Sequence, residues 1–481
     1  MTERKPRLSE DWLAVWIGLG IFTLSLGVLA GVDLLGWGVN TNVWLRPSQV
    51  LTPASTAYAG CPGLLSLLAT YLFLLGVTTL GAAALRVKIG QFVCGFSIIF
   101  WISYACWILG SYAYIAATPD KRAAMGISWS LNLTAEAGFV VALIAGLLVS
   151  NFLPRFAESI QAAIRPEWYI KTGIVILGGL LGVSAAQQLA LAKTMMFSGL
   201  CAMIVAYLIF WAAVYFVARK FFGFNREWAA PLASGISICG VSAAIATGAA
   251  IKSRPVVPVM VSSLVVIFAV VELLALPFAA RQFLHQQPMV AGAWMGLAVK
   301  TDGAAVASGA IADSLICAKA EEADGLRYEK GWVMNTATTV KVFIDLFIGV
   351  WAFVLAVVWC TAIEGRAGEK VPVRQIWERF PKFVLGYMAT LLVVMLIAIK
   401  WPGLTAKTKA AMGEANVFRG IFFVMTFFTI GLVSNFKKLW EEGIGKLAAV
   451  YVVCLFGFII WIGLLIAWIF FHGVKPPLLG G

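Results

Sequence analysis

The chain carries, between residues 234 and 248, the sequence Ser234-Gly-Ile-Ser-Ile-Cys-Gly-Val-Ser-Ala-Ala-Ile-Ala-Thr-Gly248, a run of small residues amid Leu, Val, Ile, Phe and Trp. A helix in lipid must satisfy its own backbone groups, so a glycine-interrupted helix is tolerated at membrane depth only where it faces protein or a watery cavity. Such broken helices bind ions and substrates in many secondary transporters. The alternative is close packing of small residues between helices. Because that packing needs small residues on one face only, we favour a substrate-binding segment.

Composition places the whole chain in a membrane. Hydrophobic residues make up 61% of the 481 positions and charged residues only 12%, unlike any soluble globular chain. Apolar runs recur at bilayer-spanning length and predict about 11 to 13 transmembrane helices, an all-α, polytopic protein of the plasma or inner membrane. The predicted spans are residues 12–37, 63–85, 91–117, 134–151, 172–186, 194–217, 256–279, 331–362, 383–399, 417–433 and 447–471, with weaker candidates at 228–251 and 289–312.

The positive charge indicates topology rather than a nucleic-acid partner. The net charge is +13, but Lys and Arg lie mainly between the predicted spans. Their distribution favours a cytoplasmic N-terminus by the positive-inside rule. Residues 364–382 are the most basic loop, which we expect to be cytoplasmic and to include a short helix in the membrane interface.

Several classes of protein are excluded by missing motifs. The chain has two histidines and eight scattered cysteines without a Cys-x-x-Cys pair, so we expect no metal and no other cofactor. It lacks a phosphate-binding loop and any hydrolase signature, so we expect no enzymatic activity.

Charged residues within apolar runs are costly in lipid and mark candidate sites. Lys300 and Asp302 are two residues apart, so they fit an unwound stretch better than a regular helix. An anion could bind there, attracted by Lys300, while Asp302 could hold a coupling cation or neutralise the lysine. A structural ion pair between them is the alternative.

Three further charged residues are candidates for ion or proton coupling. Lys341 and Asp345 lie four residues apart on one helical face, where a direct salt bridge is the favoured interpretation. Glu272 could carry a proton or contact a polar group of a neighbouring helix.

A break near Cys239 and Gly240 would offer an anion the free N–H groups and positive dipole end of the second half-helix. Ser237 and Ser242 would add hydroxyl donors. The candidate substrate-binding residues are Ser234, Ser237, Cys239, Gly240, Ser242, Lys300, Thr301, Asp302 and Ser308; the coupling candidates are Asp302, Lys341, Asp345 and Glu272.

The chain resembles the sulfate exporter family of YeiH-like membrane proteins. The resemblance rests on residues 234–246, on Gly-Ala-Trp-Met-Gly at 292–296, on Thr-Ile-Gly-Leu-Val-Ser-Asn-Phe at 429–436, and on Gly-Ile-Val-Ile-Leu-Gly at 173–178. This family is grouped with sodium/proton antiporters and bile-acid symporters. The resemblance therefore implies inverted repeats, two discontinuous crossing helices, and a core that moves against a scaffold.

Two departures from the family pattern bear on substrate and coupling. In the segment that corresponds to residues 299–309, relatives have Val-His-Asp/Asn-x-Ala-Gln-Val-Val-Ala-Ala-Gly. In this chain Lys300 stands where relatives have the histidine, and an alanine stands where they have the glutamine. Relatives also have Val-Lys-Leu-Thr-Arg, and residues 340–345 keep Lys341 but lose the arginine. A lysine does not titrate near neutral pH as histidine does, so proton coupling through position 300 is in doubt.

We expect an accessory or scaffold part at residues 1–130 and a transporter region at 131–472, with core helices around 172–186, 228–251, 289–312 and 417–434. The main hypothesis is a secondary active transporter of a small anion, sulfate, sulfite, a sulfonate or a small carboxylate, that works by alternating access. Export is the expected direction, although the residues themselves indicate none. H⁺ or Na⁺ is the expected coupling ion, and a homo-oligomer is possible. The alternatives are a cation/proton antiporter on the same scaffold and a membrane subunit that does not transport.

Overall fold

The structure is a computed structural model. It describes residues 9–117, 119–130, 137–187, 189–251, 253–254, 256–359, 382–435 and 445–479. These residues form two compact units, the first from Met1–Ala192 and Lys382–Val433, the second from Lys193–Pro381 and Ser434–Gly481. The predicted core helices around 172–186 and 417–434 belong to the first unit, and those around 228–251 and 289–312 belong to the second.

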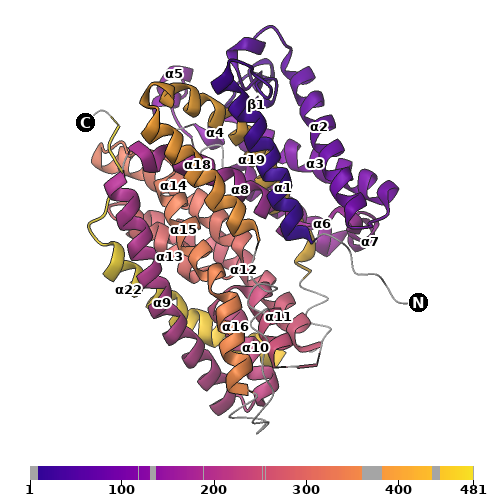
Figure 1. Cartoon of the computed structure of the whole chain (residues 1–481), viewed down its shortest axis with the longest axis vertical. Coiled ribbons are helices and arrows are strands. Elements are labelled where there is room, and N and C mark those ends of the chain that lie inside the picture. Colours follow the sequence, from indigo (N-terminus) through magenta and orange to yellow (C-terminus); the bar gives the residue numbers. More distant parts are fainter. Residues whose placement is uncertain are drawn as a thin grey trace. The chain divides into compact units, whose positions relative to one another are not determined.

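The first unit is helical apart from one small hairpin (Figure 1). Its helices are α1 (Glu10–Ser25), α2 (Gly63–Ala84), α3 (Ile89–Gly110), α4 (Ala113–Ala116), α5 (Pro119–Met125), α6 (Ala137–Phe152), α7 (Pro154–Ser159), α8 (Pro166–Gln187), α18 (Phe383–Lys400) and α19 (Thr405–Val433). Short 3-10 turns lie at Leu26–Ala30, Pro47–Gln49, Thr56–Tyr58, Gln161–Ala163 and Pro402–Leu404.

Helix α8 is the centre of the first unit and packs against α1, α18 and α19. Glycine permits the closest approach: a Cβ added at Gly178 would lie 2.3 Å from the carbonyl oxygen of Tyr387 in α18. Beside it, the Thr390 hydroxyl donates to the carbonyl of Val175 at 2.7 Å. In this unit small residues therefore allow close packing of helices. The same role was the alternative interpretation of residues 234–248.

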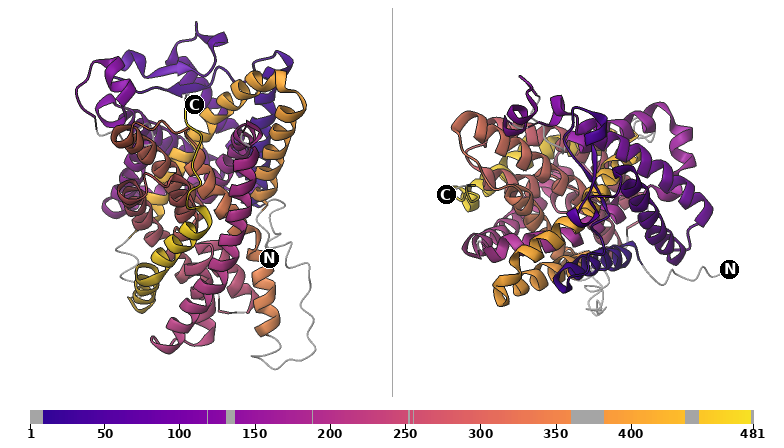
Figure 2. Two further views of the ribbon diagram at one scale, coloured as in Figure 1. Left: turned by 90° about the vertical axis from the view of Figure 1, so that its left-hand side faces the viewer. Right: turned by 90° about the horizontal axis from the view of Figure 1, so that it is seen from above.

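A two-stranded hairpin follows the first helix and was not predicted. Strand β1 (Val39–Thr41) pairs antiparallel with β2 (Leu51–Pro53), with Asn40 opposite Thr52. In Figure 2 the hairpin lies at one end of the helices of its own unit. Its strands are too short for alternation of polar and apolar residues to reveal them in the sequence.

The second unit holds the remaining helices and no strand among its described residues. They are α9 (Leu189–Lys220), α10 (Arg226–Ser237), α11 (Gly240–Ala250), α12 (Val256–Phe283), α13 (Pro288–Ala298), α14 (Asp302–Asp324), α15 (Trp332–Leu346), α16 (Ile348–Val358), α21 (Gly445–Cys454), a π-helical turn (Leu455–Ile459) and α22 (Ile460–Phe471).

Helix α14 lies at the centre of the second unit. It packs against α12, α13 and α15, and 94% of its most apolar 18-residue window is buried. Its mean hydropathy over that window, 1.2, is the lowest among the candidate spans. A comparatively polar helix is tolerated at membrane depth because protein, and not lipid, surrounds it.

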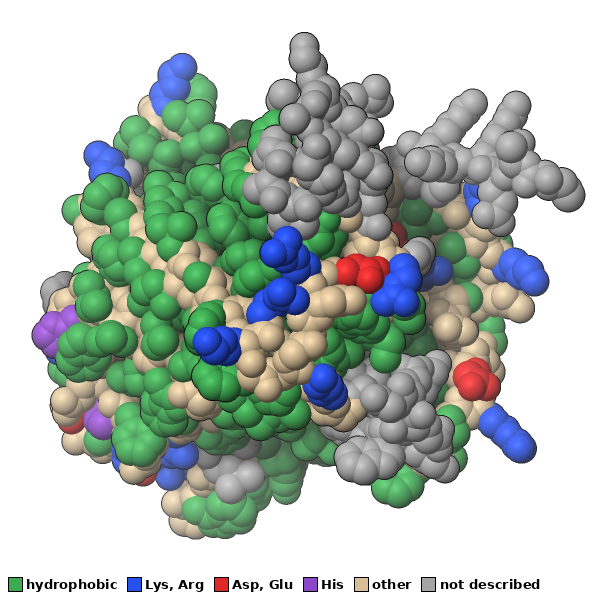
Figure 3. Space-filling view, turned by 90° about the horizontal axis from the view of Figure 1, so that it is seen from below, with side chains coloured by type: hydrophobic (Ala, Val, Ile, Leu, Met, Phe, Trp, Pro, Cys, Tyr) green, Lys and Arg blue, Asp and Glu red, His purple; other side chains and the backbone are tan. Residues whose placement is uncertain are grey.

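The predicted class is confirmed: the protein is an all-α, polytopic membrane protein. Among the described residues, nine helices are long and apolar enough to cross a membrane. Large hydrophobic side chains are exposed on several of them, such as Leu64 and Leu80 on α2 and Phe197 and Leu208 on α9. Figure 3 shows hydrophobic side chains over much of one face.

Some predicted boundaries were wrong, and others fall outside the described residues. The first predicted span, 12–37, ends earlier, because the helical turns stop at Ala30. The span predicted at 331–362 corresponds to the candidate span Trp332–Val358, within which a single residue, Phe347, separates α15 from α16. The predicted loop and interfacial helix at 364–382 lie outside the described residues except for Lys382, and the inverted repeats stay a prediction.

Candidate functional site

The first predicted helix break is confirmed as an interruption, but α10 and α11 do not continue along one axis: they pack side by side as a helical hairpin, with the hydroxyls of Ser234 and Thr247 2.7 Å apart. Helix α10 ends at Ser237, Ile238 leaves the helical conformation with φ −108° and ψ −94°, and α11 begins at Gly240. A Cβ added at Gly240 would lie 2.2 Å from Cγ1 of Val265 and 3.2 Å from the carbonyl oxygen of Lys300. Residue 240 must therefore be glycine, because Val265 and the backbone of Lys300 pack against it.

The second predicted break, around Lys300, is likewise confirmed as an interruption between two helices that pack side by side, because Gly292 of α13 and Gly309 of α14 both lie against residues 333–337 of α15. Helix α13 ends at Ala298, and Val299 and Thr301 have extended backbone conformations before α14 begins at Asp302. The Thr301 hydroxyl caps the new helix by accepting from the amide of Ala304 at 3.2 Å. Asp302 places a carboxylate in the first turn, where the helix dipole favours negative charge.

The two breaks touch each other. The amide of Gly240 donates to the carbonyl oxygen of Lys300 at 2.6 Å. The amide of Lys300 donates to Oε2 of Glu272, from α12, at 3.1 Å. Backbone groups freed by one break are thus satisfied by the other break and by a buried carboxylate, as burial requires.

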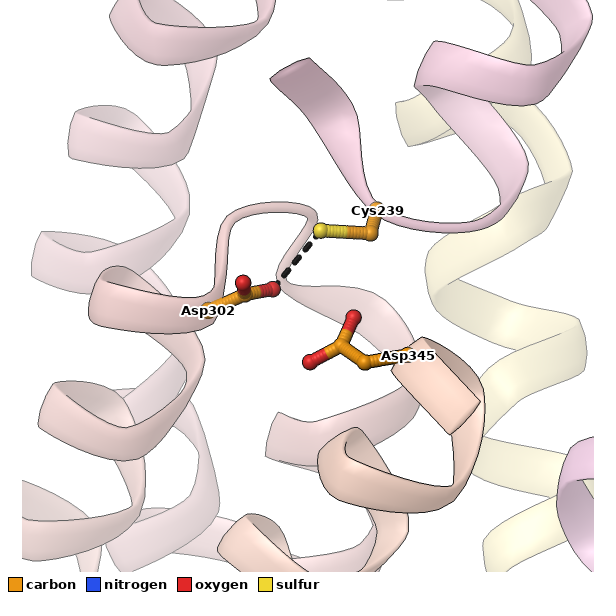
Figure 4. A group of neighbouring side chains, drawn as sticks. All are labelled: Cys239, Asp302 and Asp345. Carbon is orange, nitrogen blue, oxygen red and sulfur yellow. Dashed lines mark hydrogen bonds between the residues drawn. The ribbon is translucent and has the colours of Figure 1, made fainter. Parts of the chain in front are cut away.

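Three potential ligand side chains converge at this junction, as Figure 4 shows. The thiol of Cys239 donates to Oδ1 of Asp302 at 2.7 Å. Asp345 reaches them from α15, and one ligand atom of each residue lies within 4.8 Å of the other two. All three residues are at most 3% exposed. Neither carboxylate oxygen of Asp345 has a hydrogen-bond partner within the described part of the chain.

Lys341 connects the carboxylates to both helix breaks. Its ammonium lies 3.8 Å from Oδ1 of Asp302 and donates to the carbonyls of Ile238 at 3.1 Å and Lys300 at 3.4 Å. The direct salt bridge predicted between Lys341 and Asp345 was wrong, because no such pair lies within 4.0 Å among the described side chains. The carbonyls at the breaks accept from the ammonium and draw it away from its helical neighbour.

Lys300 does not pair with Asp302, so the predicted alternative of an ion pair between them was wrong for the described side chains. The Lys300 ammonium donates to the carbonyl of Leu297, at the end of α13, and lies 4.8 Å from the ring centre of Phe210. This completely buried side chain therefore caps the helix before the break. Its cation–π contact and the favourable field of a helix C-terminus offset the cost of burial.

The predicted hydroxyl groups meet different surroundings. Ser234 accepts from Trp211 Nε1 at 3.0 Å and from the hydroxyl of Thr247 at 2.7 Å, so it joins α9, α10 and α11. The hydroxyls of Ser237 and Ser308 are buried without a hydrogen-bond partner in the described structure. The side chain of Ser242 lies outside the described residues.

The charged groups of the junction do not balance when all are ionised. Lys300 and Lys341 supply two positive charges, whereas Glu272, Asp302 and Asp345 supply three negative charges. Each residue is at most 3% exposed, so the unmatched charge cannot be left to solvent. The site is therefore suited to gain one positive charge, as a proton or a cation.

The five charged residues and Cys239 could be found from the sequence, but their arrangement could not, and Phe210, Trp211 and Thr247 were missed. From the sequence, Cys239 belongs to an anion-binding segment, and Lys341 with Asp345 forms a separate pair. Lys341 and Asp345 share one face of a span, and that face must pack against a polar segment. This shared face is the sequence signal that connects the two residues to the site. The sequence does not indicate which segment that is.

Paired broken helices around buried charged residues define a polytopic helical membrane protein with a candidate ion or substrate site at the breaks. Residues 122–450 match the family described as Conserved hypothetical protein 698. The chain therefore belongs to this family, whose curated relatives carry the name UPF0324 membrane protein.

Three of the relatives named UPF0324 membrane protein are bacterial. The chain is 41% identical over 476 residues to a UPF0324 membrane protein of Nitrosomonas europaea, covering 98% of this chain and 97% of the relative. It is 30% identical over 373 residues to one of Rhodopirellula baltica, covering 76% of this chain and 60% of the relative. One of Nitratidesulfovibrio vulgaris is 28% identical over 349 residues, covering 70% of this chain and 55% of the relative. No solved structure matches the chain.

Proposed function

We propose that this protein is a secondary active transporter in which Asp302 and Asp345 carry a coupling proton or cation. One observation carries the proposal: the interruption between α10 and α11 meets the interruption between α13 and α14 at the Gly240 to Lys300 hydrogen bond, beside two buried carboxylates. Irregular backbone at membrane depth is characteristic of transporter binding sites. The proposal assigns no enzymatic reaction to the chain.

The charge of the junction supports a role in coupling. With all groups ionised, the five charged residues leave one negative charge unmatched, and both oxygens of Asp345 lack a donor in the described structure. A buried carboxylate in that condition takes up a proton or a cation, because unpaired charge in the protein interior is costly. Gain and loss of that ion would change the charge at the helix breaks in each transport cycle.

A small anion is the second candidate ligand of the same junction. Its support is the resemblance to sulfate exporters together with the buried hydroxyls of Ser237 and Ser308, which have no partner among the described residues. Protonation of both Asp302 and Asp345 would leave the junction with one net positive charge, which suits sulfate, sulfite, a sulfonate or a small carboxylate. On this view the anion and the proton bind together, in a plasma or inner membrane protein with a cytoplasmic N-terminus.

Flux through the purified protein in liposomes tests the proposal. Uptake of labelled sulfate, sulfite, sulfonates and small carboxylates is measured with and without imposed proton and sodium gradients. We expect saturable uptake that responds to one gradient in the wild type and loses that response in Asp302→Asn. Asp324→Asn is the matched control, since it lies on the same helix α14 but pairs with His285 away from the breaks. Absence of both anion uptake and gradient-driven cation flux would contradict the proposal.

A further inference from the structure

We propose that Cys239, Asp302 and Asp345 form a binding site for a thiophilic divalent cation, for which Zn²⁺ and Cd²⁺ are the probes. The site shares its two carboxylates with the proposed coupling site and in that sense rests on the proposed function. The three residues come from the two breaks and from α15, and their ligand atoms lie within 4.8 Å of one another.

The distances are close to those of a metal centre. Zinc bonds of about 2.3 Å to sulfur and about 2.1 Å to oxygen place tetrahedral ligand atoms roughly 3.4 to 3.6 Å apart. The sulfur of Cys239 and Oδ1 of Asp302 are 2.7 Å apart, joined by a hydrogen bond, and no pair of ligand atoms is more than 4.8 Å apart. To bind an ion, the contact between Cys239 and Asp302 must open, and the other separations already lie within 4.8 Å.

The carboxylate of Asp345 independently indicates a missing ligand. It is 1% exposed and both of its oxygens lack a hydrogen-bond donor among the described residues. Figure 4 shows this carboxylate on the side of α15 that faces Cys239 and Asp302. Buried carboxylates nearly always have donors or bind cations, and none of the described neighbours supplies a donor here.

The ligand types favour a soft divalent ion over the other cations of the cell. Magnesium and calcium require shells of oxygen ligands, whereas a cysteine sulfur favours zinc and related metals. The thiol releases its proton on binding, so the sulfur and two carboxylates carry three negative charges. A divalent ion and the nearby Lys341 ammonium carry three positive charges, so the occupied site is neutral.

Binding is measured on the full chain in detergent, without any gradient. Titration calorimetry with Zn²⁺ and ultraviolet absorption of the sulfur-to-Cd²⁺ bond compare the wild type with Cys239→Ser and Asp345→Asn. The matched control is Cys454→Ser, which alters another completely buried cysteine, on α21. We expect each site variant to weaken binding of one ion per chain by at least about tenfold, with the control unchanged.

The absorption band assigns the ligand. Its loss in Cys239→Ser but not in Cys454→Ser supports the site, and so does weaker binding in Asp345→Asn when the serine variant does not fold. The proposal is overturned if the wild type binds neither ion, or if binding and absorption persist in both site variants. The binding experiment measures no flux, so the two proposals can fail separately. Transport without Zn²⁺ binding contradicts only this inference. Zn²⁺ binding without transport contradicts only the proposed function.

Discussion

The amide of Gly240 and the carbonyl of Lys300 are joined by a hydrogen bond of 2.6 Å that connects the interruption between α10 and α11 to that between α13 and α14. Neither group could make this bond inside a regular helix, so the bond exists because the helical backbone is interrupted at both places. The ammonium of Lys341 lies against the same carbonyl, at 3.4 Å. The junction is thus one hydrogen-bonded unit, and changes to its members have defined consequences.

Substitution of Gly240 tests how tightly the breaks are packed. We expect Gly240→Ala to lower the free energy of unfolding by about 1 to 3 kcal/mol, since its Cβ would overlap Val265. Thermal unfolding in detergent measures the effect. The additional change Val265→Ala should restore part of the loss, and Gly413→Ala, where nothing lies within 4 Å of an added Cβ, should have little effect. Equal effects at positions 240 and 413 would be incompatible with the contact.

Removal of the Lys341 ammonium tests its link to Asp302. Lys341→Met should lower the free energy of unfolding by about 3 to 5 kcal/mol, because it leaves a buried carboxylate without its counter-charge. Addition of Asp302→Asn should recover part of that loss. A double-mutant cycle on thermal stability provides the measurement, and strictly additive effects would show that the two residues do not interact.

Lys300 is predicted to act on its own helix rather than on Asp302. Lys300→Met should lower stability by about 1 to 3 kcal/mol, through the lost bond to Leu297 and the lost contact with the Phe210 ring. A cycle of Lys300→Met with Asp302→Asn should show much weaker coupling than the cycle at Lys341. Stronger coupling at Lys300 would mean that the ammonium faces Asp302 after all.

The pair of Glu227, in the first turn of α10, and Arg254, which precedes α12, predicts a small pH effect. Arg254 donates to Oε1 of Glu227 from its side chain at 3.0 Å and from its amide at 2.8 Å, and these bonds lower the pKa of the Glu227 carboxyl. A lowered pKa stabilises the fold above the carboxyl's unfolded-state value, and this contribution disappears as the pH falls through the folded-state value. We expect Glu227→Gln to reduce the melting temperature slightly at pH 7 and not at pH 3. The effect stays small because the arginine side chain is 64% exposed.

The helix breaks could be predicted because the local sequence around each of them indicates an interruption. Glycine and small residues around position 240, and two charges too close for one helical face at 300 and 302, indicate interruption without knowledge of the fold. The membrane class followed from composition for the same reason. The positions of Lys341 and Asp345 on one face were equally visible.

The partners of the charged residues could not be predicted, because they depend on contacts between distant segments. The tendency of charges four residues apart to pair predicted a bond between Lys341 and Asp345, whereas carbonyls freed at the breaks and Asp302 are the partners present. Such carbonyls become acceptors only once the helices are interrupted and packed together. The hairpin at residues 39–53 was missed for a different reason, since three-residue strands carry almost no periodic signal.

The most direct test of the central claim, that Asp345 carries the coupling ion, compares two modes of transport in Asp345→Asn. Accumulation driven by a proton or sodium gradient and exchange of labelled for unlabelled substrate at equilibrium are measured in the same liposomes. We expect the variant to lose gradient-driven accumulation by at least about tenfold while it retains exchange, because the ion no longer binds but the substrate path is intact. Gradient-driven accumulation equal to that of the wild type and of Asp324→Asn would contradict the claim.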